Sequence, residues 1–550
     1  MKKYRMGIIF FISNLVALAT NGVNNDFELF LQRRQEQQID KVLEKELEQI
    51  NEEEEKENIL SKSSKHKFFI KKITLVGEKI PNLLKVNKLI DLNTNKSLGL
   101  DEIKNLTHRL TNIYISKGYV GARVLIPTQQ NLKDGVLKLV VVLGEIESIK
   151  YRDNSEVDKL KVWWTFPTQR GDVLKLSEVE QGVTNLNRAP QNNATINILP
   201  GTEFGKSIIE VKNERKSYWH GLSFGYNNFG SESTGRDKIN FSYGIGDMIG
   251  LNEVFSIYGS ANIFDSYANK KDNNFGVDLV IPFKSWDIGV SYNQSKTLQT
   301  VAGNIQDLKF TGKTELTSYR LGKVLYSYPN GKVRWDSVLN LKNKENFVNK
   351  EKINVSSRKS ASWKNSLSAS GRVFNGAYYI SASYQRGLLG FGTSENIPKE
   401  NSRARYKKYT TYAKYIKPFT LGKNQFVYEF SNSTQFTTNK LYSDEKYTLG
   451  NELTVRGYQN SISGDKGYFF RNQLYYSLPG WFNGYRIYTG FDFGETGDKK
   501  SQFKTLKGGA IGIDYTTNHV SVDLSVGKSL KYIDSKDKKP VIYLSTNFFF

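Results

Sequence analysis

The chain has 550 residues, no cysteine, and a formal net charge of +23 from 78 Lys+Arg and 55 Asp+Glu. Without cysteine it can form no disulfide, thiolate nucleophile or cysteine-ligated metal site. Its 4 histidines are scattered without metal-ligand spacing, so we expect no metal and no cofactor. The length exceeds one ordinary core and predicts several domains or one very large architecture.

The first 67 residues predict three segments. Residues 1–19 have the layout of a secretory signal: a basic start, an apolar run of about twelve residues, and small residues before Thr20. That run is short for a membrane span, so we expect a signal rather than an anchor. Residues 24–58 predict a charged helix with a narrow apolar stripe, either a coiled-coil piece or an amphipathic segment docked in a polar cavity. Residues 59–67 predict a flexible linker.

Two repeats with the order β-α-α-β-β follow, over residues 68–144 and 145–215. Apolar residues at strand and helix spacing define their elements. In the first repeat we expect strands near 69–76, 119–126 and 136–143, and helices near 86–90 and 103–114. In the second we expect strands at 145–151, 195–199 and 207–211, and helices at 157–166 and 177–186.

The remaining residues, 216–550, hold most of the 32 Tyr, 32 Phe and 45 Gly. Apolar residues alternate there with small or polar ones, as in Leu222, Phe224 and Tyr226, and no run is apolar enough for a membrane helix. At roughly ten residues per strand plus turns, the segment accommodates about sixteen antiparallel strands. We therefore predict an all-β transmembrane barrel, preceded by two α/β domains and an N-terminal helix. The alternative is a soluble β-sandwich.

One pair of short segments stands out within the predicted barrel. Val455-Arg456-Gly457-Tyr458 lies in a loop region rich in Gly, Ser and Asn, and Phe491-Asp492-Phe493-Gly494 lies in a predicted strand. A guanidinium held by a carboxylate inside a polar channel would act as a latch. The alternative is an ordinary exposed arginine and an unrelated aspartate facing the lumen.

Local motifs carry a resemblance to a known family. The second repeat contains Glu180-Gln181-Gly182, Asn187-Arg188 with Pro190, and Pro200-Gly201. Their spacing resembles the second polypeptide-transport-associated (POTRA) domain of two-partner-secretion transporters, the family of the haemolysin and filamentous-haemagglutinin exporters. Short barrel motifs around residues 228–253, 280–286 and 384–392 are similar to those of the same family and occur in the same order. The terminal Phe550 resembles the assembly signal of outer-membrane barrels.

The resemblance implies roles for the two conspicuous segments. Val455 to Tyr458 looks like the tip of a loop that folds back into the barrel, and Asp492 looks like the wall residue that faces its arginine. The second motif departs from the family at one position, where Gly490 stands in place of Phe. The N-terminal helix is implied to be a plug.

The same resemblance implies a protein of the bacterial outer membrane with its POTRA domains in the periplasm. The expected function is recognition of one large exported partner and its passage, unfolded, through the barrel without nucleotide. Outer-membrane lipid and the barrel assembly machinery are further expected partners. Consistent with this, we find no phosphate-binding Gly-rich loop.

Three other functions explain the sequence less well than transport. An assembly factor of the same superfamily usually carries more repeats and leaves the N-terminal helix unexplained. A barrel enzyme is disfavoured because no catalytic grouping stands out, and a porin needs no periplasmic repeats. We expect no nucleic-acid partner, since the Lys and Arg form no basic stripe.

Overall fold

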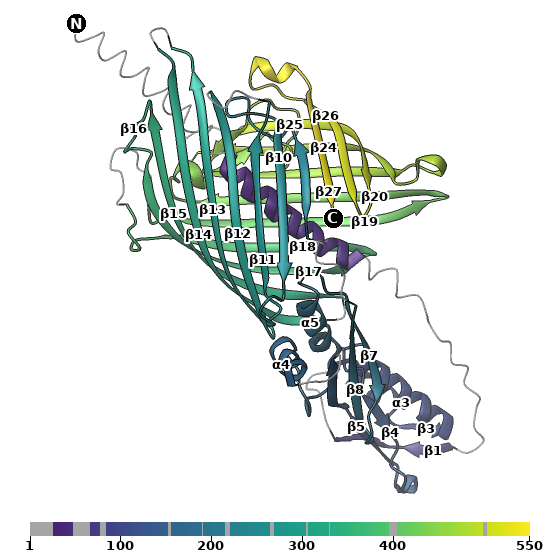
Figure 1. Cartoon of the computed structure of the whole chain (residues 1–550). Coiled ribbons are helices and arrows are strands. Elements are labelled where there is room, and N and C mark those ends of the chain that lie inside the picture. The colour runs from purple at the N-terminus through teal and green to yellow at the C-terminus, as the bar shows by residue number, and fades with distance from the viewer. Residues whose placement is uncertain are drawn as a thin grey trace.

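The computed structural model describes residues 26–47, 67–77, 84–151, 156–189, 191–214, 221–264, 269–303, 306–328, 330–394, 404–498 and 503–550. A large barrel forms the body of the molecule, with an arm of two small α/β units extending from one end (Figure 1). The expected signal at 1–19 and nearly all of the linker at 59–67 lie outside these residues. So do Pro190 and the predicted helix residues 24–25 and 48–58.

The barrel closes from sixteen antiparallel strands, so the predicted fold class is confirmed and the β-sandwich alternative is wrong. A two-residue strand, β16 (Glu351–Lys352), extends only the tip of β15. The sixteen strands are β9 (Ser223–Asn227), β10 (Lys238–Gly246), β11 (Val254–Asn262), β12 (Lys270–Phe283), β13 (Trp286–Val301), β14 (Leu308–Tyr328), β15 (Gly331–Val348), β17 (Arg358–Val373), β18 (Gly376–Leu388), β19 (Lys407–Leu421), β20 (Asn424–Thr437), β23 (Lys466–Ser477), β24 (Tyr485–Gly497), β25 (Lys504–Thr516), β26 (Val520–Ser529) and β27 (Val541–Phe549).

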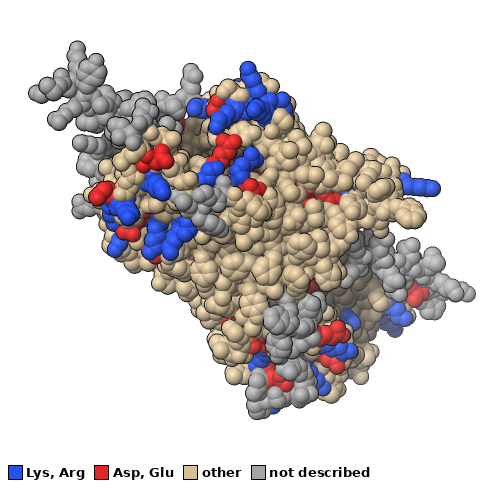
Figure 2. Space-filling model, turned by 45° about the horizontal axis from the view of Figure 1, so that its top comes forward, with Lys and Arg blue, Asp and Glu red and all other residues tan. Residues whose placement is uncertain are grey.

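The alternation along each strand separates a polar lumen from an apolar outer wall. On β13, for example, Asp287 and Asn293 are buried inside, whereas Ile288 and Val290 are exposed outside. Figure 2 shows the charged residues gathered toward the two ends of the molecule, with a broad band of other residues between them. This is the surface expected of a barrel whose outer wall contacts lipid.

The last strand closes the barrel against the first. β27 pairs with β26 over eight residue pairs but with β9 over only five, from Ser545–Asn227 to Phe549–Ser223. Phe550 continues this junction, because its amide donates to the Leu222 carbonyl and its ring contacts Phe224. The terminal residue therefore lies at the seam of the barrel.

The first repeat of the arm has the predicted order with two additions. Its elements are β1 (Lys67–Ile70), β2 (Lys72–Gly77), α2 (Leu84–Asn93), β3 (Lys96–Gly99), α3 (Leu100–Ile115), β4 (Arg123–Leu125), the short 3-10 helix η2 (Leu132–Asp134) and β5 (Val136–Val142). The single strand expected at 69–76 is wrong. It breaks at Lys71, because β1 pairs with β3 while β2 pairs with β5 in the sheet β2-β5-β4.

The second repeat follows the prediction closely. Its elements are β6 (Glu145–Tyr151), α4 (Glu156–Thr165), α5 (Leu176–Leu186), β7 (Ala194–Pro200) and β8 (Lys206–Asn213). The sheet order β6-β8-β7 leaves β7 at an edge. Its core is formed by apolar side chains of the helices and the sheet, namely Ile146, Tyr151, Phe166, Leu174, Val179, Leu186, Ala194, Ile209 and Val211.

The N-terminal helix, residues 26–47, lies within the barrel rather than in a coiled coil (Figure 1). Its apolar stripe meets the inner wall, where Ile39 and Leu43 pack against Ala377. The interpretation of an amphipathic segment docked in a polar cavity matches this placement. Among the described helices, none is long and apolar enough to cross a membrane.

Candidate functional site: the loop tip and helix inside the barrel

The loop between β20 and β23 carries the conspicuous arginine into the lumen. It contains the 3-10 helix η3 (Ser443–Glu445) and two short paired strands, β21 (Tyr447–Leu449) and β22 (Ile462–Gly464). The paired strands fold the loop as a hairpin whose tip turns back onto the inner wall. A tight turn made by the Asn451 side chain, which accepts from the Leu453 and Thr454 amides, shapes the approach to the tip.

Arg456 is clasped by Asp492 of β24 in a two-pronged ion pair. Its Nε donates to Oδ2 at 2.7 Å and its Nη2 to Oδ1 at 2.9 Å, and the Arg456 backbone amide adds a bond to Oδ2 at 3.1 Å. Nη1 donates to the Gln473 side chain at 3.0 Å. Arg456 is 2% exposed and Asp492 is 0% exposed, so the pair is shielded from water. Such a fork fixes orientation as well as charge.

The two residues after the arginine add further anchors to the wall. The Gly457 amide donates to the Tyr543 hydroxyl of β27 at 3.0 Å, with Gly457 in the left-handed region at φ 90°. The Tyr458 hydroxyl donates to the Lys531 carbonyl at 2.6 Å and accepts from the Lys507 amide at 2.9 Å. Burial raises the pKa of Tyr458. The tip is thus tied to β24, β25, β27 and the loop after β26.

Apolar packing also holds the loop against the inner wall. Val455 is fully buried in a cluster formed by the loop hairpin and the inner wall. Its buried members are Tyr447, Leu449, Val455, Tyr458, Phe469 and Leu506. The neighbours of Asp492 point the other way, with Phe491 half exposed on the outer wall. Gly494 lies beneath the loop, where an added Cβ would meet Leu449 and Val455 at 3.1 Å.

Glycines on the inner wall make room for the tip. An added Cβ at Gly508 would lie 2.1 Å from the Arg456 carbonyl oxygen, and one at Gly490 would lie 2.2 Å from Arg456 Nη2. At Gly527 it would lie 2.9 Å from the Gly457 amide. At Gly490, where the family motif has Phe, the absence of a side chain leaves space for the Arg456 guanidinium in this chain.

We expect Gly508→Ala to displace the loop tip. The methyl group would collide with backbone rather than with a flexible side chain, at a cost of about 1–3 kcal/mol for overpacking. Because the chain lacks cysteine, Val455→Cys provides a single buried thiol as reporter. Labelling by a soluble maleimide should rise in Gly508→Ala. Gly509→Ala is the matched control, because Gly509 has only ordinary contacts; equal labelling of both would contradict the prediction.

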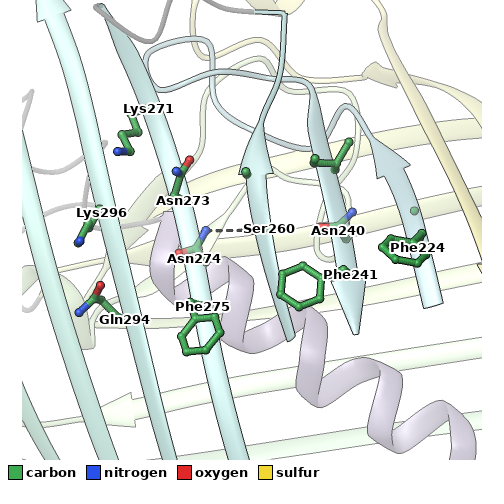
Figure 3. A pocket seen from close by; sticks show the side chains of 13 residues that line it. Phe224, Asn240, Phe241, Ser260, Lys271, Asn273, Asn274, Phe275, Gln294 and Lys296 are labelled. Carbon is green, nitrogen blue, oxygen red and sulfur yellow. Dashed lines mark hydrogen bonds between the residues drawn. The ribbon is translucent and has the colours of Figure 1, made fainter. Parts of the chain in front are cut away.

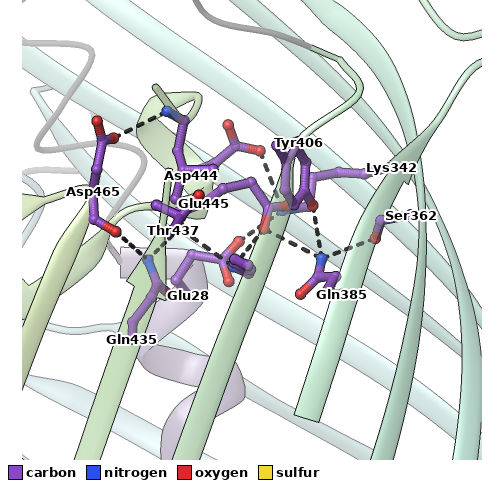
Figure 4. A network of polar contacts seen from close by, with 12 residues as sticks. Glu28, Lys342, Ser362, Gln385, Tyr406, Gln435, Thr437, Asp444, Glu445 and Asp465 are labelled. Atoms are coloured by element: carbon purple, nitrogen blue, oxygen red, sulfur yellow. Dashed lines mark hydrogen bonds and ion pairs between the residues drawn. The ribbon is translucent and has the colours of Figure 1, made fainter. Parts of the chain in front are cut away.

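The base of the loop is held by a network of charges (Figure 4). Arg358 donates to Asp444 at 2.9 Å, and Lys408 donates to Glu445 at 2.7 Å. Lys342 of β15 bonds Asp444 at 3.2 Å and also Glu28 of the N-terminal helix at 2.9 Å. One lysine of the wall therefore holds both the loop and the helix.

The helix also contacts the inward loop directly. Arg33 donates through Nε to Glu452 at 2.6 Å and through Nη2 to the Phe229 carbonyl at 2.7 Å. Glu452 lies four positions before Arg456 in the same hairpin. Nothing in the sequence pattern pairs Arg33 with Glu452, which are 419 residues apart.

Further polar contacts tie the helix to opposite parts of the wall. Lys414 of β19 bonds Asp40 at 2.5 Å and Glu36 at 3.1 Å. Arg34 bonds Asp278 of β12 at 2.6 Å and lies 3.2 Å from the centre of the Tyr258 ring. The helix is therefore held from both sides of the lumen.

Comparison with known proteins identifies the architecture. A model of the family described as haemolysin secretion/activation protein ShlB/FhaC/HecB matches residues 205–515. The chain belongs to this family. Models of POTRA domains match residues 68–144, of the ShlB type, and 145–200.

Relatives and solved structures agree with this assignment. The chain is 28% identical over 470 residues to the outer membrane transporter CdiB of Dickeya dadantii, covering 84% of this chain and 81% of that protein. It is 27% identical over 481 residues to the hemolysin transporter protein HpmB of Proteus mirabilis, with coverage of 84% and 81%. The structure of CdiB from Escherichia coli shares the fold with a TM-score of 0.83 at 23% identity, over 96% of this chain and 99% of that one.

The protein is accordingly an outer-membrane transporter of the ShlB/FhaC/HecB family and not an enzyme. Its barrel lies in the outer membrane and its two POTRA domains lie in the periplasm. The two arm repeats are the POTRA domains, here called POTRA 1 and POTRA 2.

The motif residues of POTRA 2 join that domain to the barrel. Gly182 of α5 faces Phe166, whose ring would lie 2.1 Å from an added Cβ, so the helix packs closely there. Gln181 donates to Asn185 at 2.9 Å, and Asn185 donates to the Lys284 carbonyl in the β12–β13 turn at 2.7 Å. Arg188 is paired with Asp287 of β13.

Other members of the motif act within POTRA 2 or face the helix. Asn187 exchanges two bonds with the backbone of Ala194, at 2.6 and 2.9 Å. Pro200-Gly201 ends the β7–β8 hairpin, and the Gly201 amide donates to the Lys206 carbonyl. Burial raises the pKa of Glu180; the nearby Glu46 of the N-terminal helix adds to this rise, and Arg372 opposes it.

Several residues that hold the tip were not predicted from sequence. Gln473 and Tyr543 carry no motif and contact the tip from β23 and β27, and Glu452 carries no motif and joins the loop to Arg33 of the N-terminal helix. Gly508 is one of 45 glycines, so only its position beneath Arg456 distinguishes it. Asp444 and Glu445 are adjacent acidic residues near the loop, which is only a weak sequence signal for a charge network.

Proposed function

We propose that this transporter exports one large partner protein, which passes through the barrel unfolded and without nucleotide. The observation that carries the proposal is the occupancy of the lumen by two elements that are not strands of the barrel, the inward loop and the N-terminal helix. Both the loop tip and the helix are held by polar contacts to the wall rather than by continuous chain pairing. A channel closed in this way can open without dismantling the barrel, because the sixteen strands keep their ladder.

The route of the partner begins at POTRA 2. Among the described residues, the outer edge of its strand β7 pairs with no other strand, and Ile198 and Leu199 of β7 are exposed. An extended client segment can add there as a further strand. The same domain contacts the barrel turns through Asn185 and Arg188. Binding at POTRA 2 is thereby connected to the channel entrance and to Glu46 at the nearby end of the helix.

Departure of the helix is the opening step. Its exit breaks the Arg33–Glu452 contact and frees Lys342 to bind only the loop acids Asp444 and Glu445. The loop tip stays clasped to the wall through Arg456. In this scheme the helix is the removable plug and the loop is the fixed wall element that lines the path of the client.

A secretion assay tests the export function. In cells that make the partner protein, removal of this chain should leave the partner in the periplasm, and re-expression should return it to the medium. Undiminished partner in the medium without this chain would refute the proposal. Nucleotide independence is tested by purified transporter in liposomes with its POTRA domains outward, where an unfolded client segment should become protease-protected without ATP.

A further inference from the structure

A groove of about 580 Å³ lies across strands β9 to β13. Figure 3 shows its phenylalanine rings with lysine and amide side chains on neighbouring strands. The lining residues on the outward positions are Phe224, Ile239, Phe241, Ala261, Lys271, Asn273, Phe275, Gln294 and Lys296. Its size is within the range of small-molecule sites.

Strand alternation places this groove on the outer wall. On β12 the buried Asp272 and Asn274 face the lumen, and Lys271, Asn273 and Phe275 occupy the opposite face. Phe224, Phe241 and Phe275 are 50%, 38% and 42% exposed. Because the chain is an outer-membrane barrel, these rings contact lipid.

Small residues between the phenylalanine rings leave space on the outer wall. Phe241 is opposite both Phe224 and Gly259, and Gly259 is in turn opposite Phe275. A Cβ at Gly259 would lie 2.7 Å from the Phe241 ring, so that ring occupies the space above the glycine. The result is an apolar trough bordered by aromatic rings.

The polar end of the groove lies at the extracellular edge of the apolar band. On β13, Trp286 marks the periplasmic rim, next to the turn that contacts POTRA 2. Lys296 lies about ten residues further along; at about 3.3 Å per residue and a tilt of about 45°, this is roughly 25 Å, the height of the apolar band. Lys271 is on the adjacent strand, above Asn273, which is opposite Lys296.

Three polar groups at the end of the groove lack partners, although Gln294 in the same lining is hydrogen-bonded to Tyr292 and Glu315. Among the described residues, neither Lys271 nor Lys296 has an ion pair or hydrogen bond, whereas the neighbouring Lys313 is paired with Glu315 at 2.7 Å. The Asn273 Oδ1 is buried without a hydrogen-bond partner. Two free ammonium groups and one free acceptor therefore border an apolar trough at the level of lipid headgroups.

We propose that this groove binds a phosphate-bearing lipid of the outer leaflet. The phosphate accepts from the ammonium groups of Lys271 and Lys296, and a headgroup hydroxyl donates to Asn273 Oδ1. An acyl chain lies in the trough between Phe224, Phe241 and Phe275. The site spans the first strands of the barrel, beside the short β9–β27 seam, so the bound lipid braces that part of the wall.

Native mass spectrometry of the full chain tests this site. The probe is diphosphorylated lipid A, titrated into detergent-solubilised protein and compared with dephosphorylated lipid A and with inorganic phosphate. We expect one molecule of diphosphorylated lipid A to bind per chain, more tightly than dephosphorylated lipid A or inorganic phosphate. Lys271→Gln with Lys296→Gln should weaken it by roughly 25-fold, about fivefold for each lysine. Ala261→Phe, which fills the trough and keeps both lysines, should also weaken it.

Controls separate this site from general attraction to the barrel. Lys323→Gln removes one charge on the outer wall at the opposite rim, where Lys323 lies 4.5 Å from the Trp286 ring, and should leave binding unchanged. Heat-modified mobility on gels confirms that each variant is folded. Equal binding of dephosphorylated lipid, unchanged binding by the double variant, or equal loss in Lys323→Gln would overturn the proposal.

Discussion

Arg456→Ala is expected to abolish secretion of the partner while the barrel still assembles. Removing the guanidinium leaves Asp492 buried without its counter-ion, at a cost of about 3–5 kcal/mol. The loop tip loses three side-chain bonds and should leave the wall. The measurement is partner protein in the medium by immunoblot, together with maleimide labelling of Val455→Cys.

The chain offers a matched control for this substitution. Arg486 forms a similar two-pronged pair with Asp514, but both residues are in the barrel wall and neither touches the loop. Arg486→Ala should therefore keep secretion near its normal level and leave the reporter thiol protected. Arg456→Lys keeps the charge but loses the two-pronged pairing, so its level of secretion should lie between those of Arg456→Ala and Arg486→Ala. Normal secretion by Arg456→Ala with a labelled, displaced loop would show that the latch is unnecessary.

Weakening the attachment of the N-terminal helix is expected to open the channel. In Glu36→Gln with Asp40→Asn, Lys414 loses two charged partners and keeps Glu429. Hydrogen bonds to charged groups contribute about 1.5–3 kcal/mol each. The open population should rise about tenfold or more. Single-channel recording in planar bilayers measures this as more frequent open events, and deletion of residues 26–67 should leave the channel open.

An exposed position on the same helix provides the control. Lys41→Gln also removes a charge, yet Lys41 is exposed and should leave the recordings unchanged. Thermal stability of the barrel should be the same in all variants, because the strand ladder is untouched. If deletion of the helix left conductance and open time unaltered, the helix would not be the plug.

The sequence determined those features that depend on local periodicity. The two-residue period from β9 to β27 follows from one face toward lipid and one toward a polar lumen, so strands were predictable without any contact information. The order of elements in the arm was predictable for the same reason, since each helix and strand shows its own spacing. The break at Lys71 was not predictable, because β1 pairs with β3 whereas β2 pairs with β5, and this choice of partners is not visible in the spacing of apolar residues.

The motif residues were also visible in the sequence, but their geometry was not. Arg456 and Asp492 are 36 residues apart, and their distance depends on a loop hairpin that folds inward and on strands that place Asp492 beneath it. Gly490 departs from the family motif, and its lack of a side chain leaves space for the Arg456 guanidinium. Only the position of the guanidinium above it makes that visible.

The seat of the N-terminal helix and the outer groove were decided by tertiary structure alone. An amphipathic stripe indicates that one face of the helix is buried but does not indicate which surface buries it. The residues that bind this helix come from β12, β15, β19 and the loop. The groove likewise gathers residues from five strands, and their alternation does not show which residues of neighbouring strands lie side by side. Period and composition are local properties, whereas contacts across a closed barrel exist only once the strand order and register bring distant residues to the same height.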